Sequence, residues 1–144
     1  DIDGPLPESD LPMEQCRELA QHPGMPAFRA AWARHEFMRL RTLDPEAARL
    51  LSRVVSRYPG RDLLEARRAE VLQPIDIGAI RQRSLVLNGQ LDTAQRRRFG
   101  RALAHELPLA RYALVSGAGH LANLDNPGAY SDLLLEFFNT TVHA

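Results

Sequence analysis

Two side chains that could exchange protons follow two short apolar runs in the second half of the chain. An apolar run at residues 85–87 leads to Asp92, and a second run at residues 113–115 leads to His120, 28 residues later (120 − 92). A glycine ends each run and allows the backbone to turn sharply. A carboxylate can hold an imidazole in one tautomer, and the imidazole can then act as a general base and a general acid.

Each of the two residues also has an ordinary structural interpretation. Asp92 stands just before Thr93 and could merely cap the N-terminus of the next helix. His120 lies between a glycine and a leucine and could be an ordinary loop residue. Taken together, an acid after one strand and a histidine after the next favour the chemical interpretation.

The surrounding residues predict a strand, a helix, a second strand and a final helix. Apolar runs at 85–87 and 112–115 are typical of buried strands, and Thr93 can cap a helix that ends near His105. This spacing predicts a parallel pair with a right-handed crossover, whose carboxyl ends meet at one edge. Asn126-Pro127 opens a final helix to about Phe138. The residues expected to face inward from the two helices are Phe99, Leu103 and Leu107, and Leu133, Leu134, Phe137 and Phe138.

The first half of the chain predicts helices and no strand. Residues 1–10 are typical of a loop because they contain two prolines and a glycine. The helices are expected at 11–22, at 26–41, from Asp44-Pro45 to Arg57, and at 62–70. The chain therefore divides into a linker and helical block at 1–72 and a β-α-β-α part at 73–144.

The motifs around the pair resemble the last two motifs of the α/β-hydrolase family. These motifs are Gly89-x-x-Asp92 and Gly117-Ala118-Gly119-His120, followed by an Asn126-Pro127 helix start and a helix ending in Leu-Glu-Phe-Phe. The order of acid and histidine is also the family's order. One departure is Arg83-Ser84 before the first strand, where family members often carry proline. The resemblance implies an α/β fold class, with the helical block as a cap over the C-terminal part of the core.

By this resemblance, the two residues belong to a Ser-Asp-His triad. Asp92 would accept the Nδ1 proton of His120, while Nε2 would take the proton of a serine. The serine and the oxyanion hole would come from the N-terminal half of the fold, in the same or a second polypeptide. No organic cofactor is implied, and the substrate would be a small ester-like molecule.

No serine of the 144 residues stands in a G-x-S-x-G motif. Ser116-Gly117 lacks the preceding glycine and already leads to His120. Cys16 falls on the apolar face of a predicted helix, which indicates a structural thiol rather than a nucleophile. We therefore expect the nucleophile to lie outside these residues. The first residues, Asp-Ile-Asp rather than Met, agree with a processed, truncated or partial chain.

A cap in this family would shape the substrate pocket. The candidates for the pocket wall are Met25, Phe28, Trp32, Phe37 and Met38 in the helical block, with Leu121 beside the histidine. Each could equally pack between helices. His22 and His35 are expected at the surface or between helices rather than in catalysis.

The resemblance implies a serine-type hydrolase that cleaves a carboxylic ester or a lactone. Other members of the fold cleave carbon–carbon bonds, thioesters or epoxides with nearly the same two residues. A different alternative is an inactive binding or regulatory module, which the missing serine favours and the intact acid and histidine oppose.

Composition excludes several other classes of protein. The 18 basic and 18 acidic residues cancel, so nucleic acid and anionic membranes are not expected partners. No apolar stretch is long enough to span a bilayer. The one cysteine favours a reducing, cytoplasmic compartment, and no metal site is expected because no ligand set has suitable spacing. Two parallel strands cannot bury both of their faces alone, so either further strands come from another polypeptide or from residues outside these 144, or the chain adopts a different fold.

Overall fold

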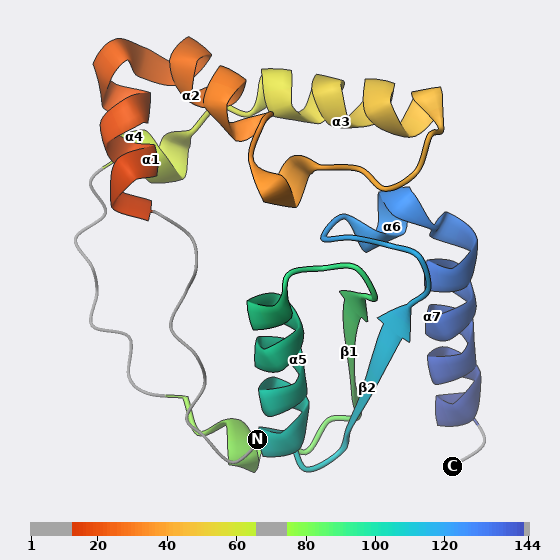
Figure 1. Ribbon diagram of the computed structural model, residues 1–144. Helices are drawn as coiled ribbons and strands as arrows, with labels where there is room; N and C mark the ends of the chain where they lie inside the picture. The colour runs from red at the N-terminus through yellow and green to blue at the C-terminus, as the bar shows by residue number, and fades with distance from the viewer. Residues whose placement is uncertain (1–12, 66–74, 143–144) are drawn as a thin grey trace. The chain divides into compact units, whose positions relative to one another are not determined.

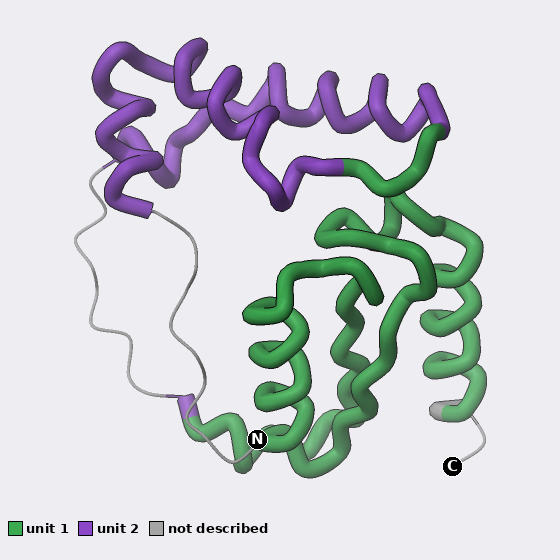
Figure 2. Tube along the Cα trace, in the orientation of Figure 1, with its two compact units in different colours: residues 1–8, 40–43, 76–144 green, residues 9–39, 44–75 purple. Residues whose placement is uncertain are grey.

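The computed structural model describes residues 13–65 and 75–142, which contain helices and a parallel sheet. The chain is therefore of mixed α/β class. Its described residues form two compact units: one comprises 40–43 and 76–142, and the other comprises 13–39, 44–65 and Ile75 (Figure 2). The short segment 40–43 thus belongs to the unit that contains the sheet, although helices of the other unit flank it in the sequence.

The unit drawn in purple in Figure 2 is helical, and its described residues contain no strand, as predicted. Its elements are α1 (Met13–Leu19), the π-helical segment η1 (Ala20–Gly24), α2 (Met25–Trp32), the 3-10 turn η2 (Glu36–Met38), α3 (Pro45–Arg57) and α4 (Arg61–Leu64). The start and end of α3 are those expected. The side chain of Asp44 accepts a hydrogen bond from the amide of Glu46 at 2.9 Å, and Gly60 beyond the helix adopts a left-handed conformation (φ 68°).

The predicted helix at 26–41 is wrong in its second half. The helix α2 ends at Trp32, and His35 takes an extended conformation with ψ of 147°. The ring Nδ1 of His35 then accepts a hydrogen bond from the amide of Phe37 at 3.2 Å and caps the short turn η2. This local side-chain bond competes with continuation of the helix.

One of the two remaining helix ends differs from the prediction. The helix expected at 11–22 stops where Pro23-Gly24 is expected to end it, because the backbone of His22 within η1 is non-helical (φ −143°, ψ 114°); residues 11 and 12 lie outside the described part. The helix expected at 62–70 is the short α4, which ends at Leu64 before an extended Glu65. Residues 66–70, like the predicted loop at 1–10, lie outside the described residues.

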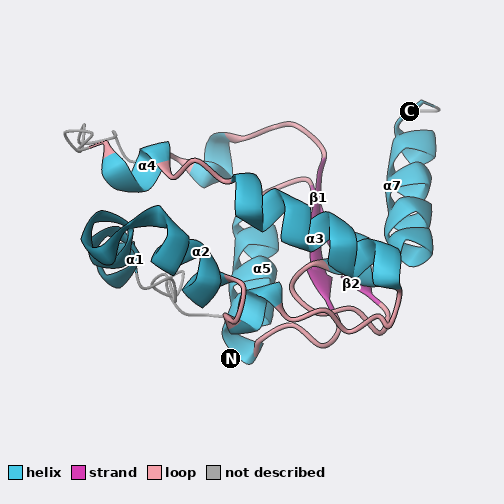
Figure 3. Ribbon diagram, turned by 90° about the horizontal axis from the view of Figure 1, so that it is seen from above, coloured by secondary structure: helices cyan, strands magenta, loops and turns pink. Residues whose placement is uncertain are grey.

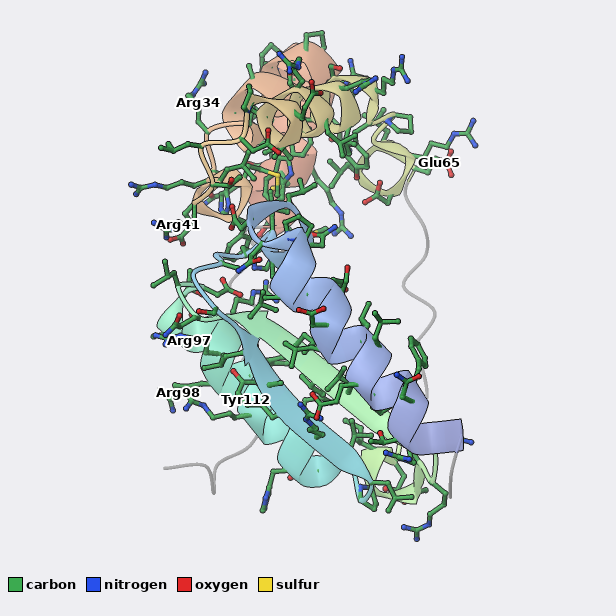
Figure 4. All side chains as sticks on the ribbon, turned by 90° about the vertical axis from the view of Figure 1, so that its right-hand side faces the viewer. Arg34, Arg41, Glu65, Arg97, Arg98 and Tyr112 are labelled. Carbon is green, nitrogen blue, oxygen red and sulfur yellow. The ribbon has the colours of Figure 1, made fainter. Side chains whose placement is uncertain are left out.

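The sheet-containing unit, green in Figure 2, contains the predicted strand, helix, strand and helix. After the 3-10 turn η3 (Ile77–Ala79), its elements are β1 (Ser84–Gly89), α5 (Ala94–Glu106), β2 (Ala110–Val115), the short α6 (Ala122–Asp125) and α7 (Pro127–Val142). The strands pair in parallel, from Ser84 opposite Ala110 to Gly89 opposite Val115. The helix α5 covers one face of this pair and α7 the other (Figures 1, 3 and 4). The predicted parallel β-α-β unit is therefore confirmed.

Small residues bring the two helices close to the strands. On α5 the fully buried residues are Gly100 and Ala102, whereas Phe99, Leu103 and Leu107 of the predicted inward stripe are only half-buried. On α7, Leu133 packs against a buried cluster of Val115, Ala118 and Ala122.

The last helix differs from the prediction in two respects. It extends four residues beyond Phe138, to Val142, and the side chain of Phe138 is exposed rather than docked on the sheet. The guanidinium of Arg111 on β2 donates to both carboxylate oxygens of Glu136 at 2.7 and 2.8 Å. This paired contact lowers the pKa of Glu136 and attaches α7 to the sheet two residues before Phe138.

Candidate functional site

The carboxyl ends of β1 and β2 carry two loops that are bonded to each other. We call residues 89–93 the acid loop and residues 116–121 the histidine loop. Beyond the last strand pair, the amide of Leu91 donates to the carbonyl of Ala118 at 2.8 Å. The amide of Gly117 in turn donates to the side-chain oxygen of Gln90 at 3.0 Å. These bonds hold the two loops in one arrangement.

Gly89 allows the two loops to approach this closely. A Cβ atom at this position would lie 1.9 Å from the carbonyl oxygen of Gly119 and 2.3 Å from that of Ala118. Real Cβ atoms essentially never come this near another heavy atom, and both neighbours are backbone atoms of the histidine loop. The glycine that ends the first apolar run is therefore required by the histidine loop, and not only by the turn that follows the strand.

The two sequence-predicted catalytic residues meet at this edge. The ring Nδ1 of His120 lies 3.2 Å from Oδ1 of Asp92 and 3.2 Å from Oδ2. The side chain of Asp92 is 2% exposed, whereas that of His120 is 31% exposed. The acid is thus enclosed by protein, and the imidazole reaches the surface of the unit.

The surroundings of Asp92 suit a buried carboxylate. Besides His120, its oxygens accept hydrogen bonds from the amide of Thr93 at 2.8 Å and from the side-chain amide of Asn88 at 3.4 Å. A buried charge needs such donors because it has lost water. The cap of α5 is a different residue: the hydroxyl of Thr93 accepts from the amide of Arg96 at 3.2 Å. The interpretation of Asp92 as merely a helix cap is therefore wrong.

This geometry selects one tautomer of His120. An ionised carboxylate can only accept hydrogen bonds, so the proton of a neutral ring resides on Nδ1. The other nitrogen, Nε2, then carries the lone pair and can accept a proton. An imidazole oriented in this way can act as a general base and afterwards return the proton as a general acid.

The predicted pocket residues fall in both units. In the helical unit, Phe28 is buried with Ala20 and Leu63, and its ring stacks on Trp32 with centroids 6.0 Å apart. The ring of His35 lies 4.7 Å from Trp32 and 4.7 Å from Phe37. Half-buried Met25 packs against the Phe28 cluster, Met38 is half-buried at the end of η2, and Leu121 is half-buried next to His120 in the other unit.

The remaining histidine and cysteine predictions concern the helical unit. His22 is exposed, and His35 lies between two aromatic rings, stacked on Trp32 and edge-on to Phe37, which confirms the expected positions of both. Cys16 is half-buried against the Phe28 cluster, as expected for a structural thiol. Burial raises the pKa of the Cys16 thiol.

The raised pKa predicts a slow reaction of Cys16 with alkylating reagents. At pH 8 less of the thiol is ionised than in a free cysteine, and the thiolate is the reactive form. We expect iodoacetamide to modify Cys16 about tenfold more slowly in the folded protein than in urea. Mass spectrometry of a time course measures both rates. Equal rates would contradict the packing of this residue.

Sequence reasoning missed three polar residues that support the site. Asn88 donates to Asp92, Gln90 accepts from the histidine loop, and Asp125 accepts from the amide of Gly119 at 2.7 Å. Asn88 and Gln90 stand within four residues of Asp92, which is the only signal that the sequence offers for them. The partners of Asp125 could not be found from local pattern.

Within residues 13–65 and 75–142, no group of three or more histidine, cysteine, aspartate or glutamate side chains is arranged to hold a metal ion. None of the helices in these ranges is both long and apolar enough to cross a membrane. No protein-family model matches the chain, and no curated protein or solved structure matches it either.

Proposed function

We propose that this chain supplies the acid and the base of a serine-type α/β-hydrolase that cleaves a carboxylic ester or a lactone. One observation carries the proposal: a buried Asp92 holds the Nδ1 of a partly exposed His120, at the carboxyl ends of adjacent parallel strands. Open α/β sheets bind their ligands at that edge. The resemblance of both loops to the family's last motifs supplies the class of reaction.

In the proposed reaction, His120 moves protons and Asp92 orients it. Nε2 of His120 takes the proton of the serine hydroxyl as its oxygen attacks the ester carbonyl. The same proton passes to the leaving alkoxide, and the acyl group remains on the serine. A water molecule then gives its proton to Nε2 and attacks the acyl carbon, and the returning proton frees the serine. Asp92 keeps Nδ1 protonated throughout and stabilises the imidazolium.

The serine, on this proposal, belongs to the N-terminal half of the fold, in the same or a second polypeptide. The 144 residues contain no G-x-S-x-G motif. In the described part of the chain, β1 pairs with β2 along one edge only, and an unpaired strand edge is a template for another strand. We infer that the N-terminal half adds its strands there. The helical residues would form the cap, with Phe28, Trp32, Phe37, Met38 and Leu121 as candidates for the pocket wall.

A second candidate function is a binding or regulatory module that has lost catalysis. The observation in its favour is the same missing serine motif. Against it stands the complete set of donors around Asp92, which a module without catalysis does not need. Cleavage of a thioester, an epoxide or a carbon–carbon bond is a further alternative, because the acid and the histidine are the same in those reactions.

A substrate panel on the purified protein tests the proposal. The panel contains p-nitrophenyl acetate and butyrate, a γ-lactone and a δ-lactone, with a thioester and an epoxide of similar size. We expect hydrolysis of an ester or a lactone with accumulation of an acyl-enzyme when the second step is slow. Turnover of only the thioester or only the epoxide would move the assignment to that subclass. No turnover on any of the six would favour the binding module or cleavage of a carbon–carbon bond.

A further inference from the structure

Asp125 lies at the centre of a set of contacts that neither the apolar pattern nor the triad explains. It is the last residue of α6 and is half-buried. Its Oδ2 accepts from the amide of Gly119 at 2.7 Å. Its Oδ1 accepts from the amides of Arg41 and Thr42 at 2.5 and 3.2 Å. One carboxylate thus binds three backbone donors from two segments that are far apart in the sequence.

The first of these segments ends in the proposed base. Gly119 immediately precedes His120, and it is buried. The amide of Gly119 belongs to the Ala118–Gly119 peptide, one residue before His120. The carbonyl of the same peptide accepts from Leu91 of the acid loop, and the N–H and C=O of a trans peptide point in opposite directions. Asp125 therefore restrains the histidine loop from the side opposite to the acid loop.

The second segment, residues 40–43, connects the helical elements before and after it. It lies between η2 and α3 in the sequence but belongs to the unit that contains the sheet. The side chain of Arg41 packs against the histidine loop, since a Cβ on Gly119 would lie 3.1 Å from its Cγ and Nε. Its Nη2 donates to the carbonyl of Leu91 at 3.4 Å. The segment therefore contacts both loops, and Asp125 holds its backbone.

From these contacts we propose that Asp125 is a positioning residue, which clamps segment 40–43 to the histidine loop and thereby fixes His120 for proton transfer. The role in catalysis rests on the proposed function, whereas the clamp itself does not. The clamp needs both carboxylate oxygens. In Asp125→Asn the side chain has one acceptor oxygen and one NH₂ donor, so either Gly119 or segment 40–43 faces a donor instead of an acceptor.

Amide hydrogen exchange, measured by NMR, tests the clamp without reference to activity. In the wild-type protein we expect the amides of Arg41, Thr42 and Gly119 to exchange at least about tenfold more slowly than their sequences alone dictate. In Asp125→Asn at least one side of the clamp should lose this protection, while the amide of Leu91 keeps its own. Asp132→Asn on the exposed face of α7 is the matched control and should change none of the four.

Kinetics of ester hydrolysis test the positioning role. For Asp125→Asn we expect kcat to fall about 10- to 100-fold with KM changed less than about threefold, because a misplaced base slows proton transfer and leaves binding of the substrate nearly intact. The Nδ1 proton resonance of His120 should also shift or broaden. Asp125→Glu, which keeps both acceptor oxygens, should recover part of the lost kcat.

The outcomes test the clamp separately from its role in positioning His120. If the amides of Arg41, Thr42 and Gly119 exchange without protection in the wild-type protein, the clamp is overturned. This result does not depend on whether the variant folds. Lost protection with an unchanged kcat and an unchanged His120 resonance would overturn the positioning role. Absence of hydrolysis in the wild-type protein would overturn the proposed function and leave the clamp to be decided by exchange alone.

Discussion

Replacement of His120 by alanine is expected to lower kcat for ester hydrolysis by about 10⁴- to 10⁶-fold. The reason is that no other group takes the serine proton once the imidazole is gone. KM should change little, because the ring acts on the proton rather than on the bound ester. Asp92→Asn should lower kcat by about 10⁴-fold, since an amide can no longer hold the Nδ1 proton.

The matched control for this change is His105→Ala. His105 is an exposed histidine in the last turn of α5, in the same unit as His120. Its loss should leave kcat within about twofold of the wild-type value, because it is exposed at the end of α5 remote from Thr93 and the acid loop. Steady-state rates on the best ester of the panel measure all three variants. A His120→Ala protein that retains a tenth or more of wild-type kcat would contradict the role of this residue.

Replacement of Gly89 by alanine should be the most destabilising single methyl addition in the sheet-containing unit. The new Cβ would clash with backbone oxygens of Gly119 and Ala118, and neither can move without breaking the bonds between the two loops. We expect the free energy of unfolding to fall by about 2–4 kcal/mol, as for severe overpacking. Urea denaturation followed by circular dichroism measures the change.

Gly128→Ala provides the control for this prediction. Gly128 lies in α7, where a Cβ would make only an ordinary contact at 3.8 Å with the side chain of Asn126. Alanine should stabilise this helix by up to about 1 kcal/mol, because it loses less backbone entropy than glycine. If the Gly89→Ala protein unfolds at the same urea concentration as the wild-type protein, this result would contradict the close packing of the two loops around Gly89.

Local pattern was sufficient for the part of the fold that carries the pair. Strand β1 and helix α5 begin where the apolar run and Thr93 predict, and helix α3 has the expected bounds because Asp44-Pro45 and Gly60 give strong local signals. The same signals place Asp92 and His120 at one edge, since parallel strands must bring their carboxyl ends together.

A local side-chain bond and several contacts between distant residues account for what the sequence could not predict. The end of α2 at Trp32 depends on the side chain of His35, and helical spacing alone continues through it. The last turn of α7 lies beyond the expected end at Phe138 and is held from a distance by Arg83, whose guanidinium donates to the carbonyl of Thr140 at 2.7 Å. The clamp at Asp125 joins residues 84 positions apart, and no local pattern encodes such a pair.

The central claim is that Asp92 and His120 activate a serine outside these 144 residues. A fluorophosphonate probe tests it most directly, because the activated serine oxygen attacks phosphorus, fluoride leaves, and the histidine takes the serine proton. Peptide mass spectrometry then locates the label. We predict one labelled serine, within a G-x-S-x-G motif that is absent from this sequence, and labelling at least about 10³-fold slower in His120→Ala. A label on Ser116, no label at all, or equal labelling of the His120→Ala protein would contradict the claim.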